Sequence, residues 1–255
     1  MRTEPLGDLA VSRDAAREKG ILGKTLVLIR KDLRIEMRAR DTLPPMLAFA
    51  FAVTLVLAFA VPGDRPERIT APLIGAVPLV DVLAGFLWVT VLFAGLIGFA
   101  RTFEVERTDR ALDVILLAPV DRSGLFAAKA IANFVYILLV EAFLLPIFAI
   151  LFRIDLGSSL GALVLVALLV NLGFTAVGTL FAALAAQTRS RELILPILAL
   201  PALVPVFIAG VELSADLFAG GGLAAIAEKG WFGILIAFDV IFTVVGALAF
   251  EFVIE

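Results

Sequence analysis

The chain has 255 residues, of which 62% are hydrophobic, 21 are basic and 24 are acidic, so its formal net charge at pH 7 is −3. It contains no cysteine and no histidine. Their absence excludes disulfides, thiolate and imidazole metal ligands, and the side chain that most often acts as a general base. We therefore expect neither covalent nor metal-assisted catalysis, and we expect no nucleic-acid partner.

The N-terminal forty residues are strongly charged, and the first apolar run begins too late for a secretory signal peptide. Residues 1–20 are polar and aperiodic, which predicts a flexible cytoplasmic tail, and residues 21–255 are expected to form one six-helix transmembrane domain. From residue 21 onward the pattern predicts an amphipathic helix in the membrane interface, with an ordinary soluble helix as the alternative. Its apolar positions are Leu22, Leu26, Ile29, Leu33 and Met37.

Six separate apolar runs approach the ~20 residues that a helix needs to cross a bilayer. The runs lie at Pro44–Val61, Pro78–Ala100, Leu125–Phe152, Leu156–Ala186, Leu193–Val211 and Trp231–Val253. They are long and continuous, unlike the short alternating strands of a membrane barrel. The predicted fold class is therefore an all-α integral membrane protein with six transmembrane helices.

The basic residues are unevenly distributed along the chain. Seventeen of the 21 precede the first run, lie in the second and fourth connections or stand just inside the third run, whereas the odd-numbered connections hold only four. Because basic residues favour the cytoplasmic side of a membrane, the N-terminus and the even-numbered connections are predicted to be cytoplasmic. Six spans then return the C-terminus to the cytoplasm.

Two connections and one run have an unusual composition. The first outward connection, "PGDRPERITAP", is short and turn-rich, and the fifth, Glu212–Gly230, is the longest outward segment and is expected to carry a short surface helix. The fifth run contains Pro196, Pro201 and Pro205. Because each proline removes a backbone hydrogen bond, this helix is predicted to be kinked or broken.

Polar side chains lie within the predicted spans. Glu141 and Asp239 are carboxyls inside apolar runs, and Asn133 lies two turns before Glu141 on a similar face. Since a carboxylate at the bilayer centre costs ~2.5–3.5 kcal/mol on insertion scales, both should face protein rather than lipid. Two roles stay open, a buried carboxyl satisfied by neighbouring helices and a role in translocation or lateral gating.

The connection between the second and third spans is densely charged. Glu106, Asp109, Arg110 and Asp113 recur at helical spacing and form one charged stripe opposite an apolar face, and Pro119 ends the pattern. The pattern predicts a cytoplasmic amphipathic helix tied at both ends to membrane spans. Such a helix either lies on the lipid headgroups or docks a cytoplasmic partner that pushes or pulls on the spans.

Three stretches of the chain resemble a known family. They are "RKDLRIEMRARDTLPPMLAFAF", "LWVTVLFAGLIGFARTFEVERTDRALDVILLAPVDRSGLFAAKAIANF" and "RSRELILPILALPALVPVFIAG". Together they are similar to the haem exporter protein B family (CcmB), the ABC-type permease subunit of the cytochrome c maturation system. The second stretch carries the pattern "E…D…L…LL.P..R…..AK" of that family, and the resemblance covers most of Leu26 to Gly210.

The resemblance implies a permease subunit in the bacterial inner membrane that is not itself an enzyme. Its expected partners are a second copy of itself, a cytoplasmic ABC ATPase, other cytochrome c maturation membrane subunits, a haem chaperone and the lipid bilayer. The complex would support haem export or ATP-driven release of the haem-loaded chaperone. The sequence also indicates that this chain has no ATPase site of its own. The "GKT" at Gly23–Thr25 lacks the upstream glycine of a phosphate-binding loop and has Glu18 in its place.

Within this framework the charged connection is expected to be a coupling helix that docks the ATPase. The expected docking residues are Glu104, Glu106, Arg107, Arg110, Leu112, Ile115, Leu116 and Pro119. ATP is expected on the partner subunit, and haem is a transported or handled ligand rather than a bound cofactor, since the chain offers almost no axial ligands. Two alternatives stay open: an ABC-2-like exporter permease for a lipid, polysaccharide or drug, and a non-transporting membrane scaffold or ATP-independent channel.

Overall fold

The computed structural model describes residues 21–39, 41–61, 68–71, 75–102, 122–157, 159–186, 188 and 191–253. Six helices in this part of the chain are long and apolar enough to cross a membrane, which confirms the predicted fold class. These helices are α3 (Leu43–Ala60), α4 (Leu79–Arg101), α7 (Arg122–Phe152), α8 (Leu160–Ala186), α9 (Arg191–Phe218) and α11 (Gly230–Val253). The other described elements are α2 (Ile21–Ala39), α10 (Leu223–Ala227) and the strands β1 (Arg68–Ala71) and β2 (Gly75–Pro78).

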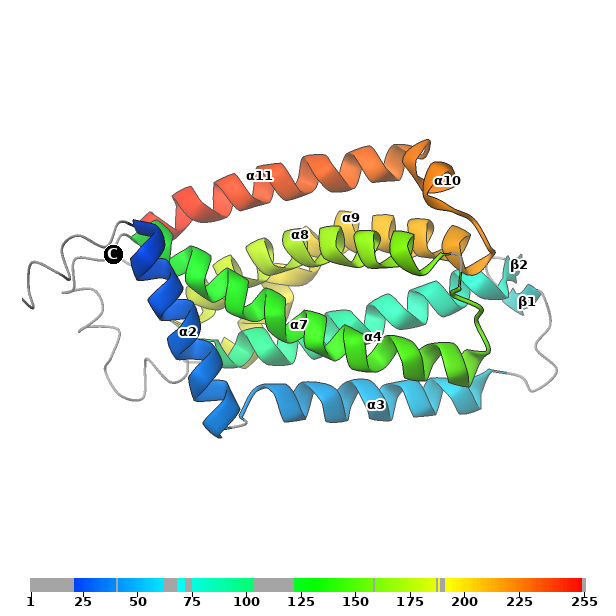
Figure 1. The fold of residues 1–255 in the computed structure, drawn as a ribbon, viewed down its shortest axis with the longest axis horizontal. Coiled ribbons are helices and arrows are strands. Elements are labelled where there is room, and N and C mark those ends of the chain that lie inside the picture. The colour runs from blue at the N-terminus through cyan, green and yellow to red at the C-terminus, as the bar shows by residue number, and fades with distance from the viewer. Residues whose placement is uncertain are drawn as a thin grey trace, which may run out of the picture.

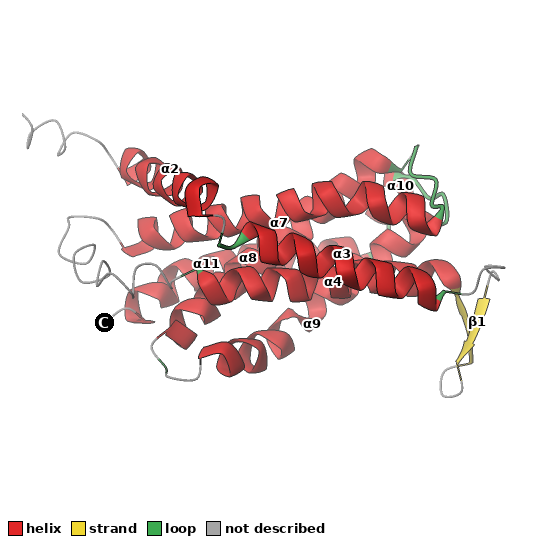
Figure 2. Cartoon of the chain, turned by 90° about the horizontal axis from the view of Figure 1, so that it is seen from below, coloured by secondary structure: helices red, strands yellow, loops and turns green. Residues whose placement is uncertain are grey.

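The six long helices form one elongated bundle with two distinct ends (Figure 1). Helix α2 crosses one end, which we call the α2 end; α4 and α8 finish there, and α7 and α9 begin there. The strands and α10 lie at the opposite end, the hairpin end (Figure 2). Helices α4 and α8 are the most buried spans, whereas α3 and α11 keep most of their surface exposed on the outside of the bundle.

Two phenylalanine–glycine contacts join α4 to α8 in the half of these helices that lies toward the α2 end. The ring of Phe99 on α4 lies against Gly178 on α8, and the ring of Phe174 on α8 lies against Gly95 on α4. The two rings meet edge to face, with centroids 5.0 Å apart. A Cβ at either glycine would overlap the facing ring, so these glycines set how closely the helices approach.

Helix α9 extends further than the sequence predicted. It runs unbroken through all three prolines and ends at Phe218, seven residues beyond the predicted end of the apolar run at Val211. Two of the polar residues that interrupt the apolar run have partners: Ser214 accepts a hydrogen bond from Trp88 Nε1 (2.9 Å), and Asp216 pairs with Lys229. The fifth connection is shorter than predicted, and α10 is the expected short helix, with Ile226 fully buried.

The first outward connection contains structure that was not predicted. Strands β1 and β2 pair antiparallel, with Arg68 opposite Pro78 and Ala71 opposite Gly75. Proline suits this place because Pro78 stands at the end of β2, where it leads into the first turn of α4. The turn-rich composition of this connection predicted turns, and the structure has a two-stranded ribbon there at the hairpin end.

Helix α2 is joined to α3 through one carboxylate. Glu36 accepts hydrogen bonds from the backbone amides of Thr42 (3.0 Å) and Leu43 (2.7 Å). The next two residues, Pro44 and Pro45, have no amide hydrogen, so Glu36 binds the donors available at the start of α3. An acidic group there also matches the positive end of the helix dipole.

The orientation of α2 corrects one part of the sequence interpretation. Leu26, one of the predicted apolar positions, is 65% exposed, whereas the charged residues Asp32 and Glu36 point into the bundle end. Leu28 and Leu33 pack on the core. The inward face of α2 is therefore part apolar and part acidic. Its two carboxylates contact Lys129 on α7 and the backbone amides of Thr42 and Leu43 at the start of α3.

Candidate functional site: a polar junction at the α2 end

The expected docking helix falls outside the residues that the structure describes. Glu104, Glu106, Arg107, Arg110, Leu112, Ile115, Leu116 and Pro119 all lie within 103–121. The described residues on either side of this segment are Thr102, just past the end of α4, and Arg122, the first residue of α7. The end of α4 and the start of α7 both lie at the α2 end of the bundle (Figure 1).

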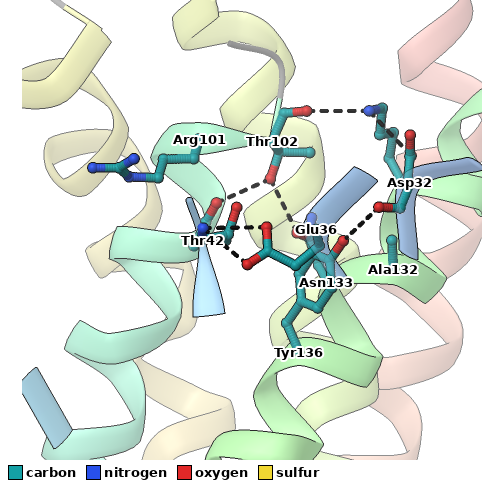
Figure 3. Close-up of a pocket in the computed structure, with 10 residues that line it drawn as sticks. Asp32, Glu36, Thr42, Arg101, Thr102, Ala132, Asn133 and Tyr136 are labelled. Atoms are coloured by element: carbon teal, nitrogen blue, oxygen red, sulfur yellow. Dashed lines mark hydrogen bonds and ion pairs between the residues drawn. The ribbon is translucent and has the colours of Figure 1, made fainter. Parts of the chain in front are cut away.

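Helices α2, α4 and α7 meet in a polar junction next to this segment (Figure 3). Its central cation is Lys129 on α7, whose Nζ lies 3.1 Å from Oδ2 of Asp32 on α2 and donates to the backbone carbonyl of Thr102 (3.2 Å). The side chains of Lys129 and Asp32 are only 6% and 10% exposed. Tyr136 on α7 donates its hydroxyl hydrogen to the Asp32 carbonyl at 3.3 Å.

The cavity at the junction is small. It has a volume of about 50 Å³, and its lining includes Glu36, Thr42 and Arg101 besides the residues above. Arg101 is exposed and points away from the cluster of hydrogen bonds (Figure 3). Ligand pockets for organic molecules are several times larger, so this junction joins helices rather than binding a substrate.

Asn133 belongs to the same junction. Its Oδ1 accepts a hydrogen bond from Thr102 Oγ1 (3.0 Å), and its Nδ2 donates to Thr179 Oγ1 on α8 (3.0 Å). The amide is 3% exposed. Asn133 thereby connects the end of α4 with both α7 and α8, a position the sequence placed near Glu141 but could not pair with its partners.

Glu141 lies two turns deeper along the same α7–α8 interface. It is 4% exposed, and its Oε2 accepts a hydrogen bond from Nδ2 of Asn171 on α8 at 2.6 Å. Eight residues separate Asn133 from Glu141 on α7, and eight separate Asn171 from Thr179 on α8. The two side-chain pairs therefore lie in the same antiparallel register, and each would be broken by a slip of either helix.

Asp239 lies between α11 and α8 and is 3% exposed. It packs against Gly173 on α8, where an added Cβ would overlap its carboxyl group, and neither carboxyl oxygen has a hydrogen-bond partner among the described residues. Both intramembrane carboxyls thus face protein, as the sequence predicted. They occupy two different interfaces of α8 and do not form a common site.

A double substitution separates a packing role of Glu141 from a functional one. Glu141→Leu or Asn171→Leu alone leaves a buried polar partner unsatisfied and should lower stability by about 1–3 kcal/mol, whereas Glu141→Leu with Asn171→Leu should cost less than the sum. The measurement is thermal stability in detergent beside the activity of the protein in cells. A double variant that is stable yet inactive assigns Glu141 a functional role, and single variants that behave as wild type show that the pair is incidental.

An apolar groove of about 620 Å³ runs along the outside of the bundle between α4 and α9. Trp88 and Phe207 lie in its wall, in edge-to-face contact with ring centroids 6.0 Å apart, and Glu212 lies at its rim. Val204 and Ile208 on α9 line the groove and are 50% and 42% exposed, and Ile197, outside the lining, is 68% exposed. Among the described residues that line this groove there is no cluster of polar side chains like that of the polar junction.

Ligands for a metal or for haem iron are scarce. The described residues contain no group of three or more His, Cys, Asp or Glu side chains that could hold a metal ion. Met46 and Tyr136 are of residue types that can ligate haem iron, but Met46 is 1% exposed and packs against Gly98, and the Tyr136 hydroxyl donates to the Asp32 carbonyl. Neither side chain is presented to a bound molecule.

The fold and the site define a class: a multi-pass helical membrane protein with a polar junction at the base of a charged connection. The chain belongs to the CcmB protein family, whose sequence model matches residues 24–255. It is 31% identical to Heme exporter protein B of Rhodobacter capsulatus over 186 residues, 73% of this chain and 80% of that protein. It is 29% identical to Heme exporter protein B of Bradyrhizobium diazoefficiens over 222 residues, 87% and 93% of the two chains.

Proposed function

We propose that this chain is the permease subunit of an ABC transporter complex for cytochrome c biogenesis, supporting haem export or ATP-driven release of a haem-loaded chaperone. The observation that carries the proposal is the family match over all six spans, from residue 24 to residue 255. Relatives named Heme exporter protein B align over most of their own length, which supports the same role for the whole membrane domain.

The ATP-hydrolysing subunit is a separate cytoplasmic protein. The described residues of this chain form the six spans, α2, α10 and one strand pair, and these elements supply no nucleotide-binding domain. The uneven distribution of basic residues makes the α2 end the cytoplasmic one, since 15 of the 17 residues on that side lie before α3 or between Arg101 and Lys129. The ATPase therefore approaches the polar junction.

The segment 103–121 is the docking element for this ATPase. Thr102, at its α4 end, is hydrogen-bonded in the polar junction, and Arg122, at its other end, is the first residue of α7, so a force on the segment reaches α4 and α7 directly. Its apolar positions, led by Leu112, Ile115 and Leu116, supply most of the docking energy, because buried hydrophobic anchors usually outweigh exposed ion pairs in an interface. Glu106 and Arg110 set orientation and association rate.

A second copy of this chain completes the permease. Six spans make half of a transporter, and a two-fold axis is the simplest way to double it. The exposed stripe of α9, with Ile197, Pro201, Val204 and Ile208 at spacings of four, three and four, has the pattern of a helix–helix seam. Because Pro201, Val204 and Ile208 of this stripe also line the α4–α9 groove, a two-fold axis at this face can pack the stripes and grooves of two copies against each other.

Affinity purification in mild detergent tests the proposed complex. We expect an ABC ATPase, other cytochrome c maturation subunits and two copies of this chain to be recovered together. The chain purified alone should show no stoichiometric low-spin haem spectrum, because the usual axial ligands are missing. Recovery of subunits of another transport system would favour a different exporter. A low-spin haem spectrum would contradict the assignment of haem as a transported or handled ligand rather than a bound cofactor.

A further inference from the structure

We propose that Lys129 is a positioning residue that ties α2 and the end of α4 to one point on α7, so that α2 moves together with the base of the segment 103–121. The tie is a property of the described helices. Its part in transport rests on the proposed function, in which an ATPase moves that segment.

The contacts of Lys129 make it a junction between three helices. The same ammonium group lies 3.1 Å from the Asp32 carboxylate on α2 and donates to the Thr102 carbonyl at 3.2 Å. A buried ammonium group needs both an opposite charge and hydrogen-bond acceptors, and these two contacts provide them. The carbonyl belongs to the last turn at the end of α4, where the helix dipole favours a cation.

The α4 end of the segment is held by two neighbouring side chains of α7. Lys129, seven residues or two turns beyond the first residue of this helix, donates to the carbonyl of Thr102. Asn133, one turn further on, accepts a hydrogen bond from the hydroxyl of the same Thr102. The end of α4 therefore cannot separate from α7 without breaking contacts of Lys129 and Asn133.

Helix α2 is attached to that base at two places. Asp32 meets Lys129 through its carboxylate and Tyr136 through its carbonyl oxygen. Asp32 also pairs with Lys31 on α2 at 3.1 Å, but the Lys31 side chain is 36% exposed. Exposed ion pairs contribute little, so Lys129 rather than Lys31 determines where α2 sits.

Three variants test the tie. Lys129→Met removes the charge and the donors, Lys129→Arg keeps both, and Asp32→Asn removes only the negative charge. Lys31→Met is the matched control, because it deletes the exposed partner of the same carboxylate. The chain has no cysteine, so spin labels at Val27→Cys on α2 and Leu139→Cys on α7, both at exposed positions, report the distance between these helices alone.

Full-length chains diluted with unlabelled protein should show one narrow distance distribution for wild type, Lys129→Arg and Lys31→Met. The distance distribution should broaden for Lys129→Met. It should also broaden for Asp32→Asn, which removes the charge of the partner but keeps its shape. A wild-type distribution in both Lys129→Met and Asp32→Asn would overturn the proposal.

The transport part is tested by ATP hydrolysis in the complex with its ATPase. Lys129→Met should lower the hydrolysis that the chain stimulates by about fivefold or more, with Lys129→Arg near wild type, because the coupling between two sites is weakened. Wild-type hydrolysis in Lys129→Met would overturn the coupling role. If no ATPase binds even the wild-type chain, the proposed function fails, and the spin-label distances still decide whether Lys129 ties α2 to α7.

Discussion

Membranes that carry Leu112→Asp with Leu116→Asp should bind almost none of the ATPase that wild-type membranes bind. Burying a leucine side chain contributes about 1.5–3 kcal/mol, so losing two anchors removes roughly 3–6 kcal/mol. A loss of that size weakens the dissociation constant by roughly a hundredfold or more. The measurement is a quantitative pull-down of the ATPase, with insertion and dimer formation of the variant checked in parallel.

Glu106→Gln with Arg110→Gln is the matched control for this experiment. It changes the charged stripe of the same segment and should slow association while leaving recovery at equilibrium close to wild type. Undiminished recovery of the ATPase on the double aspartate variant would mean that the segment 103–121 rests on lipid. The docking surface would then lie on α2.

Gly178→Leu should disrupt the contact between α4 and α8 at Phe99. The added side chain would occupy the space that the ring of Phe99 fills against Gly178. Overpacking a core costs about 1–3 kcal/mol or more, and a loss of 3 kcal/mol lowers the melting temperature by roughly 6–12 °C in a chain of this size. The measurement is the fraction of monodisperse protein left after heating in detergent.

Gly161→Leu provides the control, because this glycine lies on the same helix and has no atom within 4 Å of an added Cβ. Phe99→Ala in the Gly178→Leu background should restore part of the lost stability by making room for the new side chain. If Gly178→Leu has the same melting temperature as Gly161→Leu and wild type, the close approach of α4 and α8 does not limit stability.

The sequence predicted the spans because each is a long apolar run. It predicted the burial of Glu141 and Asp239 because exposing a carboxyl to lipid is costly. It placed the end of α9 too early. Glu212, Ser214 and Asp216 end the apolar run, but Trp88 on α4 and Lys229, just before α11, pair with two of them and let the helix continue.

The polar junction could not be predicted in the same way. Asp32 lies among lysine and arginine residues on α2, and nothing local distinguishes a carboxylate that meets Lys129 from one that faces water. Asn171 and Thr179 gave a weak signal, as polar residues within a long apolar run. Assigning their partners requires the register of α7 against α8, which the two helix patterns leave open.

The most direct test of the account is ATP hydrolysis by the co-purified ATPase in lipid vesicles, with and without this chain. The account predicts that hydrolysis rises when the wild-type chain is present and falls back when Leu112 and Leu116 are changed to Asp. Hydrolysis that does not depend on the chain would contradict a permease driven by the segment 103–121, and would identify the protein instead as a membrane scaffold.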